Sequence, residues 1–329
     1  MKVLVTGGAG FIGSNICAAL LEHGADVTVL DNFSSGWRAN LERLSGIRVE
    51  RGDVRDTEAV TKAMDGCDTV FHLAASVGNK RSIDHPHVDT AINVQGTLNI
   101  LMAARDQCVE KLVVSSSAGI YGELKTLPIR EDHPLAPLTP YGVSKLYTEK
   151  MSLAFARTYG MEAICLRYFN VYGPNQRFDA YGNVIPIFAF RALAGDPIVI
   201  FGDGQQTRDF VHVDDVVQAN IKAATNRGVS GAFNIASATQ VTIRDLAHAV
   251  NSHVDRPVAI EHAGVRRGDV AHSRADITSA QQAFGYVPET ELTPGLAGYM
   301  AWAREEADRA ANATMSEKDL QTAEPWHAE

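Results

Sequence analysis

The chain has 329 residues, of which 45% are hydrophobic and 21% are charged, and its formal net charge is −9 at pH 7. This length and composition are typical of a globular protein that can form two lobes with substantial cores. The negative balance argues against nucleic-acid binding, because phosphate contacts need clustered Lys and Arg. Four widely spaced cysteines, the lack of an apolar run of about 20 residues and an immediate strand-like start predict a cytoplasmic protein that does not bind membranes.

Short apolar runs alternate with amphipathic stretches through the first half of the chain. The runs typical of strands are Val3–Val5, Val27–Leu30, Ile47–Val49, Val70–Leu73, Leu112–Val114 and Ala163–Leu166. The stretches with helical periodicity are Ser14–His23, Thr57–Met64, Asp89–Ala104 and Tyr141–Tyr159. This alternation predicts an α/β fold, a doubly wound parallel sheet of the Rossmann type with helices on both faces.

The sequence pattern changes near Phe169, where Gly, Pro, Asn and Asp become frequent and strand-like runs no longer alternate regularly with helical stretches. We therefore predict a second, smaller α/β lobe that binds the substrate. Phe210–Asp215 and Ala232–Ala236 are expected to be a strand and a return to the first lobe. The expected division is a nucleotide-binding lobe of residues 1–168 and about 206–237, a second lobe of about 169–205 and 238–300, and a C-terminal helix with a loose tail over 301–329.

The segment Thr6–Gly13 follows the first strand and opens the first helix. Its glycines, Gly7, Gly10 and Gly13, allow a tight turn, close approach of the backbone to a pyrophosphate and close packing of helix on sheet. The helix N-terminus also offers free N–H groups to the phosphates. Asp31 ends the second strand, where a carboxylate can bind ribose hydroxyls and would repel a 2′-phosphate. The motif therefore predicts a dinucleotide site that prefers NAD to NADP.

Asp53 and Val54 follow the third strand, where they would bracket the adenine ring. An ordinary helix N-cap is the alternative role for Asp53.

Tyr141 and Lys145 lie four residues apart in a predicted helix, so both side chains occupy one helical face. A free tyrosine has a pKa of about 10 and is a poor base at neutral pH. A neighbouring ammonium group favours the phenolate, which can then take a proton from an alcohol. Ser115–Ser117 end a predicted strand, where ligands bind in doubly wound sheets, although turn and capping chemistry is an equal alternative.

Taken in order, these motifs resemble the extended short-chain dehydrogenase/reductase family, and within it the nucleotide-sugar 4-epimerases typified by UDP-glucose/UDP-galactose 4-epimerase. The resemblance covers residues of about 1–300 and includes Leu73–Ala75 and the segment Arg167–Pro174. It implies a tightly held NAD, a UDP-sugar substrate and a small sugar-nucleotide lobe. It also implies a homodimer formed through two helices of each subunit, here about 89–104 and 141–159.

The family's roles carry over to individual residues. The resemblance implies that Tyr141 is the catalytic base, that Lys145 binds the nicotinamide ribose and lowers the pKa of the tyrosine, and that Ser117 binds the sugar 4-hydroxyl. The implied cofactor-binding residues are Gly7, Gly10, Phe11, Ile12, Gly13, Asp31, Asn32, Asp53, Val54, Leu73, Ala74, Ala75, Asn93, Ser115, Tyr141, Lys145 and Tyr168. The implied substrate-binding residues are Ser117, Asn170, Asn183, Arg208, Arg266, Asp269 and Ser273.

Some of these assignments also rest on chemistry alone. The guanidinium forks of Arg208 and Arg266 suit a diphosphate, although surface ion pairing is equally common for an arginine. Asn170 and Asn183 could instead stabilise turns.

The residues after Ser117 indicate the reaction. Related 4,6-dehydratases carry Thr-Asp-Glu at positions 117–119, because elimination of water needs an additional acid and base. Ala118 and Gly119 provide neither. A site limited to Tyr, Ser and NAD can oxidise an alcohol and reduce the ketone again, which predicts interconversion of UDP-hexoses at C4 through a 4-keto intermediate. Another nucleotide-sugar dehydratase or reductase is the less favoured reading.

Sugar choice depends on fewer residues. Ser273 aligns with the family's gatekeeper position, and a small residue there leaves room for a 2-acetamido group, so we expect UDP-GlcNAc and UDP-GalNAc beside UDP-glucose and UDP-galactose. Lys80 and Arg81 would suit a uronate, which keeps UDP-glucuronate 4-epimerase as the alternative. His72 is expected to be a core residue. No metal site is predicted, although Asp84–Asp89 offers donors at close spacing.

Overall fold

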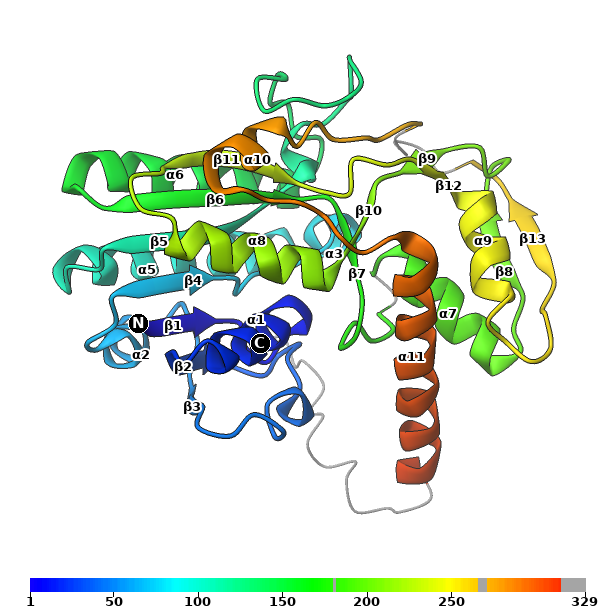
Figure 1. Cartoon of the computed structure of the whole chain (residues 1–329), viewed down its shortest axis with the longest axis horizontal. Coiled ribbons are helices and arrows are strands. Elements are labelled where there is room, and N and C mark those ends of the chain that lie inside the picture. Colours follow the sequence, from blue (N-terminus) through cyan, green and yellow to red (C-terminus); the bar gives the residue numbers. More distant parts are fainter. Residues whose placement is uncertain (180–181, 266–270, 315–329) are drawn as a thin grey trace.

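The computed structural model describes residues 1–179, 182–265 and 271–314. The first lobe contains a parallel sheet of seven strands, which confirms the predicted doubly wound fold (Figure 1). The order across the sheet is β11 (Gly231–Ile235), β6 (Glu162–Tyr168), β5 (Lys111–Ser117), β4 (Thr69–His72), β1 (Lys2–Thr6), β2 (Asp26–Asp31) and β3 (Arg48–Arg51). The strand order reverses beside β1, where ligands bind in such sheets at the carboxyl ends of the strands.

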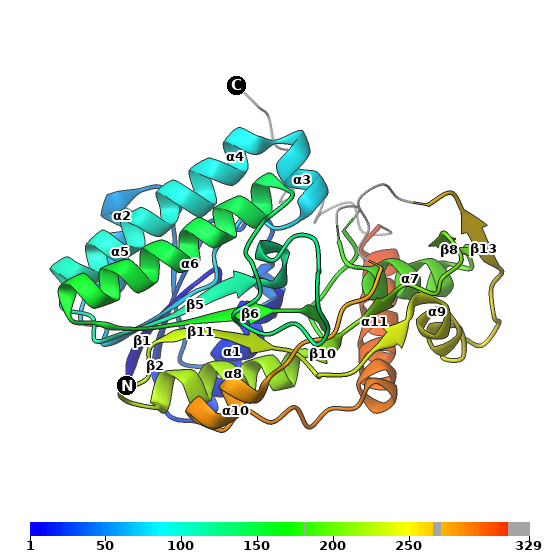
Figure 2. The same cartoon turned by 90° about the horizontal axis from the view of Figure 1, so that it is seen from above.

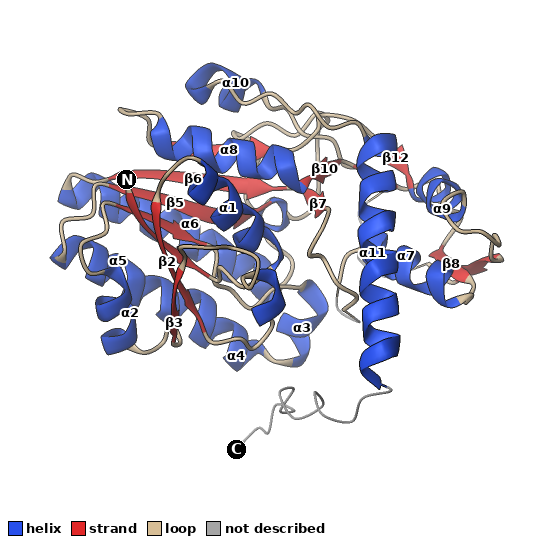
Figure 3. Cartoon of the chain, turned by 60° about the horizontal axis from the view of Figure 1, so that its bottom comes forward, coloured by secondary structure: helices blue, strands red, loops and turns tan. Residues whose placement is uncertain are grey.

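Helices cover both faces of this sheet (Figures 2 and 3). One face packs against α2 (Thr57–Met64), α5 (Thr97–Asp106) and α6 (Pro140–Tyr159), and the other against α1 (Phe11–Glu22), α8 (Val213–Thr225) and α10 (Thr278–Phe284). Each face has its own apolar core, built from the alternating side chains of strands such as β1 and β5.

The stretch expected to be one helix over Asp89–Ala104 is divided in the structure. A short helix, α4 (Pro86–Thr90), follows α3 (Asn79–Asp84) and continues into a π-helix, η2 (Ala91–Gly96), before α5 begins. Proline at the first position of α4 is favourable because its missing N–H has no partner there in any helix. A π-turn changes the direction of side chains along the helix and often occurs at functional sites.

The second lobe lies beside the carboxyl ends of the sheet strands (Figure 1). Its core is formed by side chains from α7 (Val184–Ala194), α9 (Ile243–Asn251) and α11 (Leu292–Thr314). Short strand pairs complete it: β8 (Ile198–Phe201) with β13 (Ile260–Ala263), β9 (Thr207–Arg208) with β12 (Val241–Thr242), and β7 (Asn170–Tyr172) with β10 (Phe210–His212).

Two expected boundaries differ from the structure. The sequence pattern predicts Ala275–Tyr286 in the second lobe, but its buried side chains belong to the core of the first lobe, where α10 packs on β11. The C-terminal helix begins at Leu292 rather than near 301, and Leu296, Tyr299 and Met300 bury its first turns in the second lobe. The start of α11 therefore follows from the apolar residues that it buries, whereas the change to an Ala-rich sequence near 301 lies inside the helix. The expected loose tail lies outside the described residues.

Within the described part of the chain, none of the helices combines the length and apolar character needed to cross a bilayer.

Candidate active site

The glycine turn joins β1 to α1 in the predicted way. Gly7 has a positive φ of 71°, and a Cβ there would lie 2.8 Å from the backbone nitrogen of Ala74. A Cβ on Gly13 would lie 2.2 Å from the carbonyl oxygen of Gly7, so neither position admits a side chain. No side chain caps α1 at Gly10. The first turn of α1 therefore keeps N–H groups for a phosphate, and the cradle fits the pyrophosphate of a dinucleotide.

Two acidic residues lie beside this turn. Asp31 is buried and accepts hydrogen bonds from the backbone N–H groups of Ala9 (2.9 Å) and Phe33 (2.8 Å). Burial raises the pKa of Asp31. Asp53 accepts a hydrogen bond of 2.7 Å from the side chain of Asn32 and forms an ion pair with Arg55. The contact joins the ends of β2 and β3, and the adenosine half of the cofactor is still only predicted to bind there.

Asp53 is not a helix N-cap, so that alternative is wrong. Asp56 caps α2 instead, and its carboxylate accepts hydrogen bonds from the N–H groups of Glu58 (2.9 Å) and Ala59 (3.2 Å).

Asn93 stands in the π-helix and ties it to the loop after β4. Its side-chain oxygen accepts from the N–H of Ser76 (2.8 Å), and its amide donates to the Ser76 carbonyl (3.0 Å). The same amide group lies 2.9 Å from the hydroxyl of Ser144 on α6. Asn93 therefore positions the loop that begins with Leu73–Ala75, which agrees with a supporting role on the cofactor side of the site.

The long helix α6 carries Tyr141 and Lys145. Thr139 caps it by accepting from the N–H of Gly142 (3.2 Å), Pro140 occupies its first turn, and Gly160 ends it in the left-handed conformation. The Lys145 ammonium is buried and donates to the Ser115 carbonyl (2.9 Å) and hydroxyl (3.0 Å).

Tyr141 lies within hydrogen-bonding reach of Ser117, the residue in which β5 ends. Ser117 also caps the short 3-10 helix Ala118–Ile120 by accepting from the N–H of Gly119 at 3.1 Å. The structure thus brings together the three predicted catalytic side chains, and the capping role of Ser117 coexists with its place beside the tyrosine.

The expected lowering of the tyrosine pKa by Lys145 is not found in the polypeptide alone. Burial raises the pKa of Tyr141 to about 12, and Asp89 adds to the rise while Ser117 opposes it. Burial lowers the pKa of Lys145 to about 8, against the pull of Asp89. Lys145 is engaged by Ser115, so its charge is directed at the strand. These influences together favour the protonated phenol over the phenolate.

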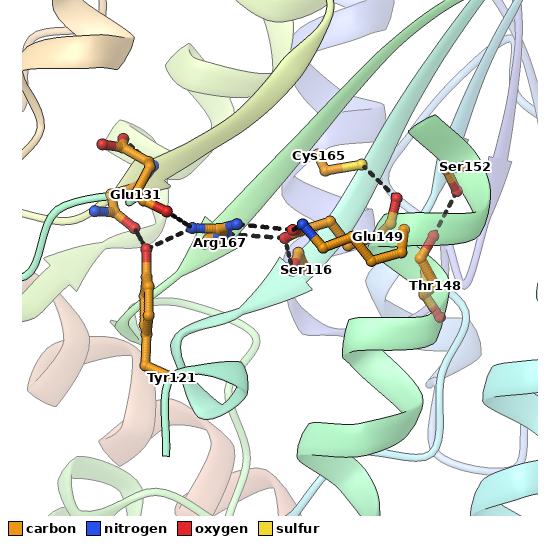
Figure 4. A network of polar contacts seen from close by, with 10 residues as sticks. Ser116, Tyr121, Glu131, Thr148, Glu149, Ser152, Cys165 and Arg167 are labelled. Atoms are coloured by element: carbon orange, nitrogen blue, oxygen red, sulfur yellow. Dashed lines mark hydrogen bonds and ion pairs between the residues drawn. The ribbon is translucent and has the colours of Figure 1, made fainter. Parts of the chain in front are cut away.

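A buried ion pair fixes α6 on the sheet (Figure 4). Glu149, one turn beyond Lys145, accepts from both Nε (2.9 Å) and Nη2 (2.7 Å) of Arg167 on β6. The Ser116 hydroxyl donates to the same carboxylate at 2.9 Å. Arg167 also donates to the Tyr121 hydroxyl and to the Glu131 carbonyl. Ser115, Ser116 and Ser117 thus each contact one residue of the series Tyr141, Lys145 and Glu149.

Ser117 apart, the predicted substrate residues that the structure describes are Asn170, Asn183, Arg208 and Ser273. Asn170 begins β7 and donates to the Asp209 carbonyl (3.1 Å), Asn183 precedes α7 without capping it through its side chain, and Arg208 lies in β9. Ser273 is buried. Arg266 and Asp269 lie outside the described residues.

Comparison with known proteins identifies the family. The sequence profile described as the NAD dependent epimerase/dehydratase family matches residues 3–236, most of the chain. The chain belongs to this family. NAD is therefore its cofactor, and the glycine turn with Asp31 is the part of this structure that fits it.

Individual members of the family are similar along nearly the whole chain. A putative UDP-glucose 4-epimerase of Methanocaldococcus jannaschii is 37% identical over 302 residues, which cover 91% of this chain and 97% of that protein. The crystal structure of a UDP-glucose 4-epimerase with UDP-glucose from Thermotoga maritima has a TM-score of 0.89 and 37% identity, covering 93% of this chain and 100% of that one. A UDP-N-acetylglucosamine 4-epimerase from Methanobrevibacter ruminantium, in complex with UDP-N-acetylmuramic acid, has a TM-score of 0.88 and 33% identity, covering 93% and 98%.

Within this epimerase/dehydratase fold, two acidic residues have structural roles that the sequence did not indicate. Asp89, expected to begin a helix, is buried inside the site, where its carboxylate accepts from the Asn93 amide at 3.1 Å. Asp209 is fully buried next to Arg208 and accepts from Ser237 and from the N–H of Ala275 (3.0 Å). Asp209 holds the Arg208 segment against the chain that leads to α10. The one sequence signal for these buried roles is that each aspartate stands close to apolar residues in the chain.

Three further residues considered in the sequence analysis have hydrogen-bond or ion-pair partners within the protein. His72 is a core residue as predicted, because its two ring nitrogens contact Thr6 and Thr97, and burial lowers its pKa to about 3. The Tyr168 hydroxyl bonds to Asn220 of α8 at 3.0 Å, inside the core, so any cofactor contact of this residue involves other atoms. Lys80 pairs with Asp84.

Proposed function

We propose that the protein is an NAD-dependent UDP-sugar 4-epimerase. The observation that carries the proposal is the placement of Tyr141 and Ser117 together at the carboxyl edge of the sheet, beside the buried Lys145 and without an acid at Ala118 or Gly119. This set of groups can move a proton to and from an alcohol, and positions 118 and 119 add no acid or base for elimination.

In the proposed mechanism, NAD supplies the hydride acceptor and donor for C4 of the sugar. Tyr141 takes the proton of the 4-hydroxyl group, and Ser117 holds that oxygen. Because burial raises the pKa of Tyr141, the positive nicotinamide ring of bound NAD, together with Lys145, would supply the charge that favours the phenolate. Lys145, held by Ser115, stands where it can bind a ribose hydroxyl. Arg208 is proposed to bind the diphosphate, while the sugar stays free to turn between the two hydride transfers.

For the sugar, we propose both UDP-glucose/UDP-galactose and UDP-GlcNAc/UDP-GalNAc as substrates. The side chain of Ser273 is small, which supports more room for a 2-acetamido group than a bulky aromatic residue would leave. Relatives of both kinds are similar to this chain, since one is named for UDP-glucose and another for UDP-N-acetylglucosamine. A uronate is the second candidate. It is less favoured because Arg81 forms an ion pair of 2.5 Å with Asp179 and Lys80 one of 2.5 Å with Asp84.

The substrate proposal is tested by NMR of product mixtures formed from UDP-glucose, UDP-GlcNAc and UDP-glucuronate. Ser273→Tyr should lower activity on UDP-GlcNAc at least about tenfold more than activity on UDP-glucose, since a clash of about 1.4 kcal/mol is worth a factor of ten. Ser273→Ala serves as the size-matched control. Equal loss on both sugars would refute the gatekeeper role, and formation of a 4-keto-6-deoxy product would refute epimerisation.

We also propose a homodimer formed through residues of about 89–104, which span the end of α4, η2 and most of α5, and through α6. A groove on the outer side of α6 supports this, because Val143 (55%) and Leu138 (68%) are unusually exposed for apolar residues. The groove is lined by Thr90, Val94, Pro137, Leu138, Thr139, Pro140, Val143, Ser144 and Tyr147.

Val143→Glu should convert the dimer to monomer in sedimentation experiments, because it places a charge in an apolar interface. Val287→Glu, at a site after α10 that is 47% exposed, should leave the dimer intact. A Val143→Glu protein with the sedimentation coefficient of the wild type would exclude this face.

A further inference from the structure

The loop between β2 and the 3-10 helix Arg38–Asn40 lies directly on the glycine turn. The Trp37 N–H donates to the Ala9 carbonyl (3.0 Å), and the Asn40 side chain donates to the same oxygen (2.9 Å). Gly36 packs so closely that a Cβ would lie 2.8 Å from the Ala9 side chain. Since Asp31 begins this loop and the glycine turn binds the pyrophosphate, the loop borders the adenosine half of the NAD site.

Arg177 reaches this loop from the other lobe. It follows β7, and its guanidinium donates to the Asn40 side-chain oxygen at 2.7 Å. The Trp37 ring covers the guanidinium at 4.7 Å, and the Trp302 ring of α11 lies 5.7 Å away. Arg177 also forms an ion pair of 2.7 Å with Glu306 of α11.

The ion pair is shielded from solvent, since the side chains of Arg177 and Glu306 are only 15% and 10% exposed. Cation–π contacts and ion pairs strengthen when they are desolvated, and a planar guanidinium can make both at once.

The segment that carries Arg177 is anchored on both sides. The Asn15 side chain of α1 donates to the Pro174 carbonyl (3.0 Å), and Asn175 donates to the Ser14 hydroxyl (3.1 Å). On the other side, the Tyr299 hydroxyl of α11 donates to the Gln176 carbonyl (2.8 Å). Arg177 is therefore held in place by contacts to both lobes, and none of these contacts belongs to the proton-transfer site.

We propose that Arg177, Trp37, Asn40, Trp302 and Glu306 form a clasp that keeps the loop closed on bound NAD and slows its release. NAD can leave the glycine turn only when this loop lifts, and lifting breaks the contacts of Arg177 with Trp37 and Asn40. Through Trp302 and Glu306, the C-terminal half of α11 thus stabilises this loop of the cofactor lobe. The proposal rests on NAD binding at the glycine turn and is independent of which sugar the protein uses.

The rate of NAD dissociation tests the clasp. Purified protein with bound NAD is mixed with an excess of an NAD-consuming dehydrogenase, and the released NAD is followed by absorbance. Arg177→Met should release NAD at least about tenfold faster, while the KM for the UDP-sugar stays within about twofold because the clasp does not contact the sugar. Arg309→Met is the matched control, since Arg309 contacts Glu306 from the exposed side of α11.

A second variant separates NAD retention from folding. Trp37 is 54% exposed, so Trp37→Leu should accelerate NAD release without lowering the melting temperature of protein stripped of NAD. The proposal is overturned if both variants release NAD at the wild-type rate, or if Arg309→Met accelerates release as much as Arg177→Met. If Arg177→Met fails to fold, the rate measured for Trp37→Leu decides. If the wild type turns over no UDP-sugar but Arg177→Met still accelerates NAD release, the proposed function fails and the clasp stands.

Discussion

Replacing Tyr141 by Phe should lower turnover of the UDP-sugar by about 10²- to 10⁴-fold, the usual contribution of a positioned acid–base group. Phe keeps the ring and its packing but removes the hydroxyl that lies beside Ser117. NAD should remain bound, because the glycine turn and Asp31 do not depend on the phenol. The measurement is the single-turnover rate with the NAD content determined on the same sample.

Tyr147→Phe provides the control for this result. Tyr147 lies on the same helix but lines the outer groove beside Val143, so its hydroxyl is remote from Ser117. It should retain turnover within about twofold. A Tyr141→Phe protein that keeps more than about a tenth of wild-type turnover would show that another group moves the proton.

Glu149→Gln should lower the free energy of unfolding by about 3–5 kcal/mol, because it leaves the buried charge of Arg167 without its partner. The two side chains are 0% and 3% exposed, and Arg167 makes two contacts to the carboxylate. Turnover should also fall, since Glu149 holds the helix that carries Tyr141. Urea unfolding and the initial rate measured on the same protein check both effects.

The expected loss depends on pH in a definite direction. Burial alone would raise the pKa of Glu149, but Arg167 and Ser116 hold it below its ordinary value of 4.5. The stabilisation from the ionised carboxylate is therefore present above that pH and is lost as the pH falls through the folded-state value. The difference between wild type and Glu149→Gln should shrink in the acid range.

Lys150→Met is the matched control for the ion pair. Lys150 approaches the same carboxylate at 3.4 Å, but its side chain is 56% exposed, so its loss should cost less than about 1 kcal/mol. If Glu149→Gln and Lys150→Met destabilised the protein equally, the buried pair would have no special role in holding α6.

The sequence predicted those parts of the site that depend on local spacing. The glycine turn needs only a strand, three glycines and a helix start, and Tyr141 and Lys145 share a face because they are four residues apart. These features can be recognised in the sequence because their contacts are made within one element or between two adjacent elements. The doubly wound sheet was predictable for the same reason, since each apolar run marks a buried strand.

Other features depend on contacts between distant segments and left no local pattern. Arg167 meets Glu149 from another element, and Arg177 meets Trp37 and Trp302 across both lobes. Asp53 and Asp56 both precede the same helix, and only the backbone geometry shows which one caps it. Ala275–Tyr286 resembles the second lobe in composition, yet packing on β11 places it in the first.

The position of β11 has a consequence for how the protein can be made. The chain leaves the sheet after β6 and returns as β11 only after much of the second lobe has been synthesised, and α10 covers that strand later still. Until then β6 is an open edge, which invites pairing with other chains. Translation that stops within the second lobe therefore yields an aggregation-prone product. The first lobe is therefore completed only by residues that follow part of the second lobe, so the two lobes are interleaved along the chain.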